Sequence, residues 1–453
     1  MAIADALRAL DRASHWQARA PYLKAWREAG IHTGETLPQM LARCAADHPD
    51  IKMVFGSLER PSQTTAGASW DASLEVAVGL HKLGLKEGDP VVVQMPNWDE
   101  GVLAMLACFR LGLIVVPMIH TYGPGETAYI LERTEAVAMI VPDRWKKIDY
   151  DARLAGIATP FLRHVIVAGD APFGRPVTRW HELLGDTTTP LPELSAGPDD
   201  ACLINFTSGT TSAPKGVVHS HHSLASEIPR FPFVLSPNGR SKLMPLPGGH
   251  IAGVIANLSP LLAADPVILM DAWDNDLAKA LIVEHRPDRA GGVPFMVAVL
   301  AEEAATLFPD GVVQMSIGAA SVPPSLMERC EAMGWPGTRT YGSTEHPTIS
   351  GAFPADPFAK RVATDGRLLE GVQVRLVDDE TGQVVGVGQP GEIVSMGPEL
   401  CKGYLEPAHN EAAFAADGWF HTGDIGVMDA EGYLAIVDRK KDIIIRGGEN
   451  ISS

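Results

Sequence analysis

The chain has 453 residues, of which 46% are hydrophobic and 20% are charged. This length exceeds what one hydrophobic core usually supports, so we expect two or three subdomains. Lys and Arg number 37 against 55 Asp and Glu, and the resulting net charge of -18 argues against nucleic acid or an anionic membrane surface as a partner.

The sequence indicates neither export nor membrane insertion. Its five cysteines form no C-x-x-C pair, and the N-terminus carries no basic run followed by an apolar core. These features favour a reduced, cytoplasmic protein. The most apolar long stretch, residues 253–270, is interrupted by Asn257, Pro260, Asp265 and Pro266, so we expect no integral membrane segment. The oligomeric state stays open.

The first half of the chain has the alternation of an α/β fold. Residues 90–95 form a continuous apolar run, as in a buried parallel strand. Asn97 offers a helix N-cap, and apolar residues then repeat at helical spacing up to Gly112, before a second apolar run at 113–116. This pattern predicts a βαβ unit.

The same pattern returns downstream. Residues 201–206 predict a strand that leads into a loop rich in Gly and Thr, and residues 312–317 predict another strand. A helix should follow the second strand, with Ser321 as its cap and Pro323 and Pro324 at its start. Residues 338–341 predict a short strand that opens into a loop.

After about residue 365 the pattern becomes that of antiparallel β structure. Residues 372–376 alternate between apolar and polar, a turn signal follows at 378–383, and residues 391–396 are again apolar. We therefore expect two α/β subdomains in residues 1–364, a small β-barrel-like subdomain in 365–437, and a hinge with the start of a further domain in 438–453. The last apolar run, 443–445, has no partner left in the sequence, which predicts truncation before that domain.

The strongest functional signal is the string T-S-G-T-T-S-A-P-K-G at residues 207–216. It follows a predicted strand and combines several hydroxyls, two glycines and the point charge of Lys215, which together suit a polyphosphate. It is not a Walker A loop, because no glycine directly precedes Lys215 and Gly216 follows it where Ser or Thr should stand. The alternative is a solvated turn rich in Ser and Thr.

Three further motifs follow in order: Y-G-S-T-E at 341–345, G-W-F-H-T-G-D at 418–424, and D-R-K-K-D-I-I-I-R-G-G-E-N-I at 438–451. With the phosphate loop, they make the chain resemble, from about residue 35 to its end, the adenylate-forming acyl-CoA synthetases, relatives of firefly luciferase and of the adenylation domains of peptide synthetases. The resemblance implies an α/β fold: a large body of two α/β subdomains with a small antiparallel β subdomain, lacking the C-terminal lid domain.

The resemblance also assigns roles to individual residues. Lys215, Thr344 and Glu345 are the implied catalytic residues: Lys215 holds the departing phosphates, Thr344 contacts the α-phosphate and Glu345 binds Mg²⁺, for which a carboxylate is a suitable ligand. Thr207 is a second candidate for the metal, and Lys441 occupies the family's hinge position. The implied nucleotide-binding residues are Thr207, Ser208, Gly209, Thr210, Thr211, Gly318, Ala319, Ala320, Tyr341, Gly342, Ser343, Asp424 and Arg439.

Each of these motifs also has an ordinary interpretation. Tyr341 can stack flat on a purine, but the motif around it could be a polar loop after an edge strand. Asp424 would accept from both ribose hydroxyls, although T-G-D alone is common turn chemistry. Arg439 resembles a second ribose and phosphate contact, and residues 439–441 could instead be a solvated charge run. The turn at 318–321, G-A-A-S, departs from the family's usual G-G-A followed by Pro or Glu.

The acyl pocket is the least specified part of the prediction. His250 lies at a position that often forms the pocket wall in the family, with a core or loop histidine as the alternative. Gly253, Gly292 and Val293 are the other candidate substrate residues, since glycines there would leave room for a bulky or long acid. His219, His221 and His222 follow the phosphate loop, and without a nearby Cys or acidic cluster we predict no metal site there.

The implied reaction has two steps and uses ATP, Mg²⁺ and coenzyme A. A carboxylate attacks the α-phosphorus of ATP, pyrophosphate leaves, and the thiol of CoA then attacks the acyl-adenylate. We expect a hydrophobic acid, either fatty or alicyclic, and impaired turnover in the truncated chain. Delivery to a carrier protein, or nucleotide binding without turnover, are alternatives; a P-loop hydrolase is disfavoured by the Walker A mismatch.

Overall fold

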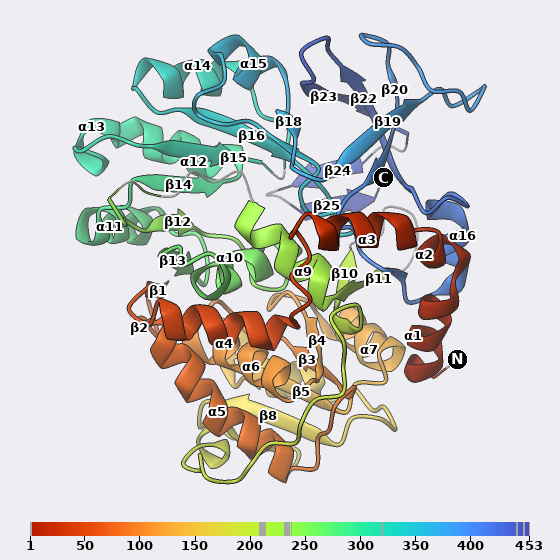
Figure 1. Cartoon of the computed structure of the whole chain (residues 1–453). Coiled ribbons are helices and arrows are strands. Elements are labelled where there is room, and N and C mark those ends of the chain that lie inside the picture. Colours follow the sequence, from red (N-terminus) through yellow and green to blue (C-terminus); the bar gives the residue numbers. More distant parts are fainter. Residues whose placement is uncertain are drawn as a thin grey trace.

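The fold is built on two large mixed sheets and one small antiparallel sheet (Figure 1). The computed structural model describes residues 2–207, 214–230, 236, 238–318, 320–440, 443–446 and 449–452. The predicted α/β class with a small antiparallel β part is confirmed by this arrangement.

The eight-stranded sheet contains the predicted βαβ unit. Its order is β21-β11-β10-β4-β3-β5-β8-β9, and all neighbours from β10 to β9 run parallel. Helix α6 (Asp99–Arg110) connects β3 to β4 and buries its apolar face in the core. The strands are β3 (Pro90–Val93), β4 (Ile114–Pro117), β5 (Ala138–Pro142), β8 (His164–Ala168), β9 (Thr178–Arg179), β10 (Ala201–Thr207), β11 (Lys215–Ser220) and β21 (Gly403–Tyr404).

The nine-stranded sheet occupies the upper left of Figure 1 and has the order β18-β17-β16-β15-β14-β12-β13-β1-β2. Its six central strands, from β16 to β1, are parallel. The strands are β1 (Lys52–Gly56), β2 (Ser62–Thr65), β12 (Lys242–Met244), β13 (Val267–Met270), β14 (Arg289–Gly292), β15 (Gln314–Ile317), β16 (Gly337–Tyr341), β17 (Ser350–Gly351) and β18 (Arg367–Leu368).

Helices cover both large sheets and fill the space between them. Helix α10 (Ile251–Leu262) is buried on nearly every side because it packs against α4, α9 and β13. The other helices of this body are α4 (Leu37–Asp47), α5 (Ala66–Lys82), α7 (Pro124–Arg133), α8 (Tyr150–Leu154), α9 (His221–Glu227), α11 (Asn275–His285), α12 (Pro294–Leu300), α13 (Ala304–Leu307), α14 (Pro324–Ala332) and α15 (Phe358–Ala363). Within the described residues, no helix is both long and apolar enough to cross a bilayer.

Two predicted helix caps are wrong. Asn97 does not cap α6, whose N-cap position is Trp98; its buried amide instead donates to the carbonyl oxygens of Leu246 at 2.7 Å and Met270 at 3.0 Å. These two bonds join the segment after β3 to the last residue of β13 and to the segment after β12, so the amide satisfies backbone carbonyls of the other sheet. Ser321 is likewise not a cap, because α14 begins after Pro323 with no side-chain cap.

The small sheet and the last hairpin follow in the chain. Strands β19 (Gln373–Val377), β20 (Gly391–Met396), β22 (Phe420–Met428) and β23 (Leu434–Arg439) form an antiparallel sheet. The expectation that residues 443–445 lack a partner is wrong: β24 (Ile443–Arg446) pairs with β25 (Glu449–Ser452). The Gly-Gly pair at 447–448 in the sequence is a hairpin signal that explains this pairing.

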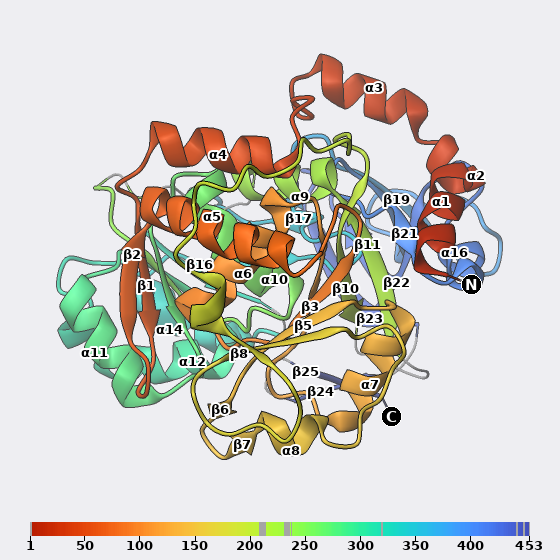
Figure 2. The same ribbon diagram turned by 90° about the horizontal axis from the view of Figure 1, so that it is seen from below.

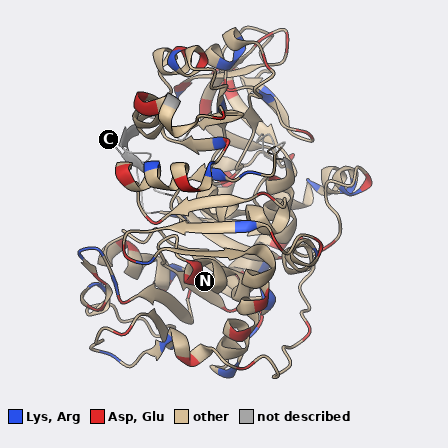
Figure 3. Ribbon diagram, turned by 90° about the vertical axis from the view of Figure 1, so that its left-hand side faces the viewer, with Lys and Arg blue, Asp and Glu red and all other residues tan. Residues whose placement is uncertain are grey.

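The predicted boundaries at residues 364 and 437 stay a prediction, and some strands do not follow them. Strand β18 comes after residue 364 but belongs to the nine-stranded sheet, and β21 lies inside 365–437 but joins the eight-stranded sheet through β11. Acidic and basic segments are interspersed on the face seen in Figure 3. The net charge of -18 is therefore not gathered into one region of that face.

An N-terminal arm, residues 3–28, was not anticipated from the sequence. Its helices α1 (Ile3–Arg12), α2 (Ser14–Gln17) and α3 (Ala20–Glu28) run along one side of the molecule, with α1 against α16 (Pro407–Ala413) (Figure 2). Arg19, only 1% exposed, donates to the carbonyl oxygens of Cys401 at 2.6 Å and Gly418 at 3.0 Å. The arm thereby holds the segment that contains β21.

Replacing this arginine tests the arm. Arg19→Ala should lower the free energy of unfolding by about 2–4 kcal/mol, because two buried carbonyls lose their donor and a buried side chain is removed. Arg8→Ala is the matched control in the same arm: its ion pair with Asp5 is exposed, so a change within about 0.5 kcal/mol is expected. Chemical denaturation measures both, and equal effects would contradict the role of Arg19.

Candidate active site at the junction of the three sheets

The phosphate loop connects two adjacent antiparallel strands. Thr207 ends β10, Lys215 begins β11, and the two residues are opposite each other in the register. Ser208, Gly209, Thr210 and Thr211, predicted to bind phosphate, lie outside the described residues. The strand pairing nevertheless fixes both ends of the loop at one edge of the eight-stranded sheet.

Lys215 and Glu345, distant in sequence, both contact one tyrosine, Tyr404. The Lys215 Nζ lies 5.1 Å from the centre of the Tyr404 ring, and the Tyr404 hydroxyl donates to Glu345 Oε1 at 2.6 Å. Burial, followed by the nearby Glu345 carboxylate, raises the pKa of Tyr404, so the phenol keeps its proton. Sequence reasoning missed Tyr404, because the strand that carries it has only two residues.

Thr344 is held through its backbone. Its carbonyl oxygen lies 2.8 Å from His219 Nε2, and the other ring nitrogen of His219 lies 3.2 Å from Ser223 Oγ. Burial is the largest cause that lowers the pKa of His219 to about 4, so the ring is neutral at physiological pH. His219 therefore supports the loop that precedes Glu345 as an uncharged side chain.

The other two histidines of this group also have partners within the fold. His221 Nδ1 accepts from the Leu37 amide at 3.3 Å, and His222 Nδ1 lies 2.9 Å from an Asp199 carboxylate oxygen. In the part of the chain that the structure describes, no three His, Cys, Asp or Glu residues gather as metal ligands. A cation near Glu345 would therefore need oxygen ligands from a bound phosphate, which is how Mg²⁺ is often held.

The expected purine and ribose residues touch each other. The Tyr341 hydroxyl donates to Asp424 Oδ2 at 2.7 Å, and Arg439 Nε lies 2.7 Å from Asp424 Oδ1. Asp424 and Arg439 are cross-strand partners in the small sheet, whereas Tyr341 ends β16 of the nine-stranded sheet. Burial raises the pKa of the Asp424 carboxyl, and the Arg439 cation opposes that shift.

The loop after Tyr341 is tightly closed. A Cβ added at Gly342 would lie 1.9 Å from the Pro347 carbonyl oxygen, so a side chain has no space there. The Ser343 amide donates to the carbonyl oxygen of His346 at 2.9 Å, which closes the loop. This closure holds Thr344 and Glu345 between two fixed points.

The predicted purine turn follows β15. The Gly318 amide donates to the Gly292 carbonyl oxygen at 3.2 Å, which places this turn beside the end of β14. Ala320 lies on the described part of the turn, and Ala319 is outside the described residues. Gly292 is a predicted acyl residue, so the structure brings one candidate acyl residue next to one candidate purine residue.

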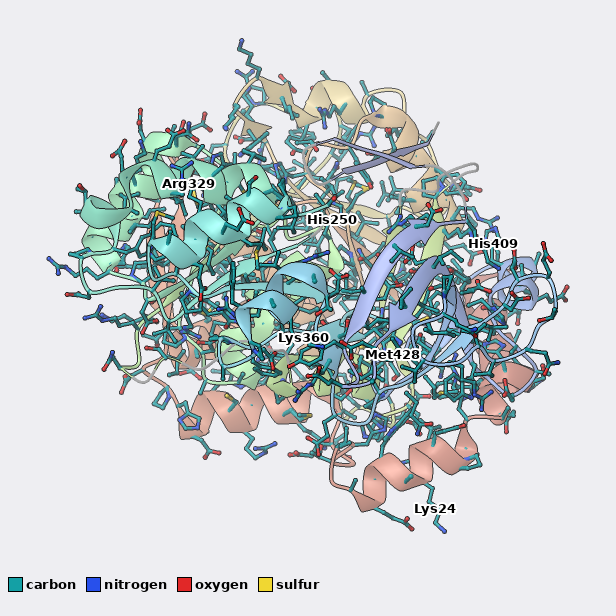
Figure 4. All side chains as sticks on the ribbon, turned by 90° about the horizontal axis from the view of Figure 1, so that it is seen from above. Lys24, His250, Arg329, Lys360, His409 and Met428 are labelled. Carbon is teal, nitrogen blue, oxygen red and sulfur yellow. The ribbon has the colours of Figure 1, made fainter. Side chains whose placement is uncertain are left out.

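The remaining acyl residues lie at the starts of two helices. His250 occupies the N-cap position of α10 and Val293 that of α12, and Val293 is buried. Figure 4 shows His250 toward the middle of the molecule, whereas Lys24 projects outward from α3. A Cβ at Gly253 would lie 1.9 Å from the Pro247 carbonyl oxygen, so this glycine permits close backbone packing. Its part in an acyl pocket stays a prediction.

The sheets and the side chains at their junction define a protein of the adenylate-forming class. Residues 41–405 match the family described as AMP-binding enzyme. The match covers well over half of the chain, so the chain belongs to the AMP-binding enzyme family.

Similar proteins include acid–CoA ligases and one N-terminal domain of known crystal structure. The chain is 28% identical to the medium-chain fatty-acid–CoA ligase of Escherichia coli (strain K12), covering 95% of this chain and 76% of that protein. It is 30% identical to the sulfoacetate–CoA ligase of Cupriavidus necator, covering 92% and 81%. The inhibitor-bound N-terminal domain of FACL13 from Mycobacterium tuberculosis superposes with a TM-score of 0.77 at 27% identity, covering 89% of this chain and all of that domain. The chain thus spans about three-quarters or more of these ligases.

Gly253→Ala tests the close backbone packing at this position. The added methyl group would overlap the Pro247 carbonyl, so the free energy of unfolding should fall by about 1–3 kcal/mol. Gly125→Ala is the control: this glycine is also helical, and nothing lies within 4 Å of its added Cβ, so stability should stay the same or rise by less than about 1 kcal/mol. Unchanged stability in Gly253→Ala would show that the position has free space.

Proposed function

We propose that the protein activates a carboxylic acid with ATP to an acyl-adenylate and then transfers the acyl group to CoA, releasing AMP and pyrophosphate. The observation that carries this proposal is the convergence of Lys215, Tyr404 and Glu345 beside the closed ends of the phosphate loop. Membership of the AMP-binding enzyme family and the acid–CoA ligases among its relatives support the same reaction class.

The chemistry needs positioning and charge stabilisation and no protein nucleophile. The substrate carboxylate attacks the α-phosphorus, and the bond to pyrophosphate breaks. Lys215 would stabilise the charge that develops on the leaving phosphates, and Thr344 would donate to the α-phosphate. Tyr341, Asp424 and Arg439 would receive the nucleoside, with the ribose hydroxyls competing for the carboxylate that Tyr341 and Arg439 now contact.

The residues present fit a magnesium ion bound together with ATP. Glu345 is half-buried, and one of its oxygens is engaged by Tyr404, while no described residue donates to Oε2. Mg²⁺ would neutralise phosphate charge when bound. Glu345 would hold it, with Thr207 as a second candidate at the start of the loop.

The class of acid is inferred from the residues of this chain, because the relatives are ligases of acids as different as a medium-chain fatty acid and sulfoacetate. Helix α10 is almost wholly apolar, and Val293 and Met296 are buried apolar residues beside Gly292. Such surroundings favour a hydrophobic acid, either fatty or alicyclic, over a short polar one.

Product analysis tests the proposal. The protein is incubated with ATP, Mg²⁺ and a panel of acids, and pyrophosphate, AMP and hydroxylamine-trapped acyl groups are measured before and after CoA is added. Pyrophosphate release that depends on the acid, followed by a thioester when CoA is present, is the expected result. Formation of ADP and phosphate would contradict adenylation, and an acyl-adenylate that ignores CoA would indicate another acceptor such as a carrier protein.

Lys215→Ala should weaken ATP binding by about 10–100-fold, since a charge-assisted contact contributes roughly 1.5–3 kcal/mol. Lys360→Ala is the control, because the Nζ of Lys360 lies 5.0 Å from the centre of the Tyr433 ring but is paired with Asp429 and Glu431, away from the candidate site. Its ATP affinity should equal that of the parent. Calorimetric titration measures all three proteins, and an unchanged affinity in Lys215→Ala would remove the central residue of the proposal.

Glu345→Gln should raise the Mg²⁺ concentration needed for half-maximal pyrophosphate release. The amide can still accept from Tyr404 but is a weaker metal ligand than a carboxylate. The metal titration is made at saturating ATP for both proteins. Superimposable Mg²⁺ curves would contradict the assignment of Glu345 to the metal.

A further inference from the structure

Tyr404 contacts both of the charged groups that the proposed reaction requires, Lys215 through its ring and Glu345 through its hydroxyl. It is 3% exposed, its ring centre is 5.1 Å from Lys215 Nζ, and its hydroxyl is 2.6 Å from Glu345 Oε1. Its strand β21 pairs with β11, with Tyr404 opposite Val217, two residues after Lys215. The tyrosine and the lysine are therefore carried by neighbouring strands of one sheet.

We propose that Tyr404 is the positioning residue of this site: its hydroxyl fixes one oxygen of Glu345, so that the other faces the metal and phosphate, and its ring holds Lys215 apart from that carboxylate. This inference rests on the proposed function. Lys215 and Glu345 carry opposite charges, and a direct ion pair between them would remove the cation from the phosphates and the anion from the metal. A neutral aromatic ring attracts the cation at its face without neutralising it.

The backbone of Tyr404 is itself fixed from both sides. The Tyr404 amide donates to Asn410 Oδ1 at 2.7 Å, and Asn410 Nδ2 donates back to the Tyr404 carbonyl oxygen at 2.8 Å. Next to it, the Leu405 amide donates to the Gly216 carbonyl oxygen at 2.8 Å. One buried asparagine and one strand contact thus determine where the phenol lies.

Glu345 is attached to the same segment through its backbone. The Cys401 amide donates to the Glu345 carbonyl oxygen at 2.8 Å, and the Cys401 carbonyl in turn accepts from Arg19 of the N-terminal arm. The main chain of Glu345 is therefore placed by Cys401 and its carboxylate by Tyr404. Loss of the hydroxyl would release the carboxylate while leaving its backbone in place.

Two substitutions separate the two roles of the side chain. Tyr404→Phe keeps the ring beside Lys215 and removes only the hydrogen bond to Glu345, whereas Tyr404→Leu removes both. The measurement is the ATP dissociation constant from calorimetry, first without metal and then over a series of free Mg²⁺ concentrations. For Tyr404→Phe we expect metal-free ATP binding within about twofold of the parent and a requirement for Mg²⁺ raised roughly tenfold, the size of a lost charge-assisted hydrogen bond. Tyr404→Leu should also weaken metal-free binding.

Tyr433 provides a matched control outside the site. Its hydroxyl donates to Asp356 Oδ1 at 2.8 Å and its ring faces Lys360 Nζ at 5.0 Å, so Tyr433→Phe removes the same kind of hydrogen bond. Its Mg²⁺ requirement should equal that of the parent. In a Glu345→Ala protein, Tyr404→Phe should cause no further change in the Mg²⁺ requirement, because Tyr404 acts through the carboxylate that this variant lacks.

The outcomes distinguish this inference from the proposed function. If the parent protein binds no ATP, the proposed function is overturned. This outcome is measured on the parent protein alone, without the variants. A parent that binds ATP, with Tyr404→Phe matching its Mg²⁺ requirement, would overturn the positioning role alone. Additive effects of Tyr404→Phe and Glu345→Ala, or loss of cooperative unfolding in Tyr404→Phe, would overturn it as well.

Discussion

The candidate site depends on the antiparallel pairing of β10 with β11. This pairing sets Thr207 opposite Lys215 and so closes the phosphate loop at its base. Because β11 also pairs with β21, the same ladder brings in Tyr404 and, through its hydroxyl, Glu345. One short ladder therefore joins segments that are about 190 residues apart in the chain and sets the distance between a cation and a carboxylate.

The three sheets meet where the polar side chains are buried. Tyr341 brings the end of a parallel strand of one sheet to Asp424 of the small sheet, and Arg439 compensates the buried carboxylate. A buried carboxylate without such partners would be costly, so this arrangement keeps an anionic acceptor in place. Although the chain has a net charge of -18, two cations lie at the candidate site: Lys215 is beside the buried Tyr404 ring and Arg439 beside the buried Asp424 carboxylate.

Local patterns predicted the strands and the βαβ unit, because apolar runs and turn residues carry that information along the chain. The phosphate-binding role of residues 207–216 stays a prediction. Local patterns could not predict which side chains cross between sheets. Asn97 is a residue type that often caps helices, but here its side-chain amide donates to the carbonyl oxygens of Leu246 and Met270. The sequence around Tyr404 did not indicate a site residue. Its position depends on the pairing of β21 with β11, two strands that are far apart in the chain. The hairpin of β24 and β25 could have been found from its Gly-Gly pair.

The N-terminal arm affects how much of the chain the candidate site requires. The family match starts at residue 41 and ends at 405, yet Arg19 holds the carbonyls of Cys401 and Gly418, and Lys402 donates to Asp11 of α1. A fragment cut at the limits of the family match would remove the arm together with α16, and with them Asn410, which fixes both backbone groups of Tyr404. The N-terminal helices and α16 therefore support the segment that carries Tyr404, although they lie outside residues 41–405.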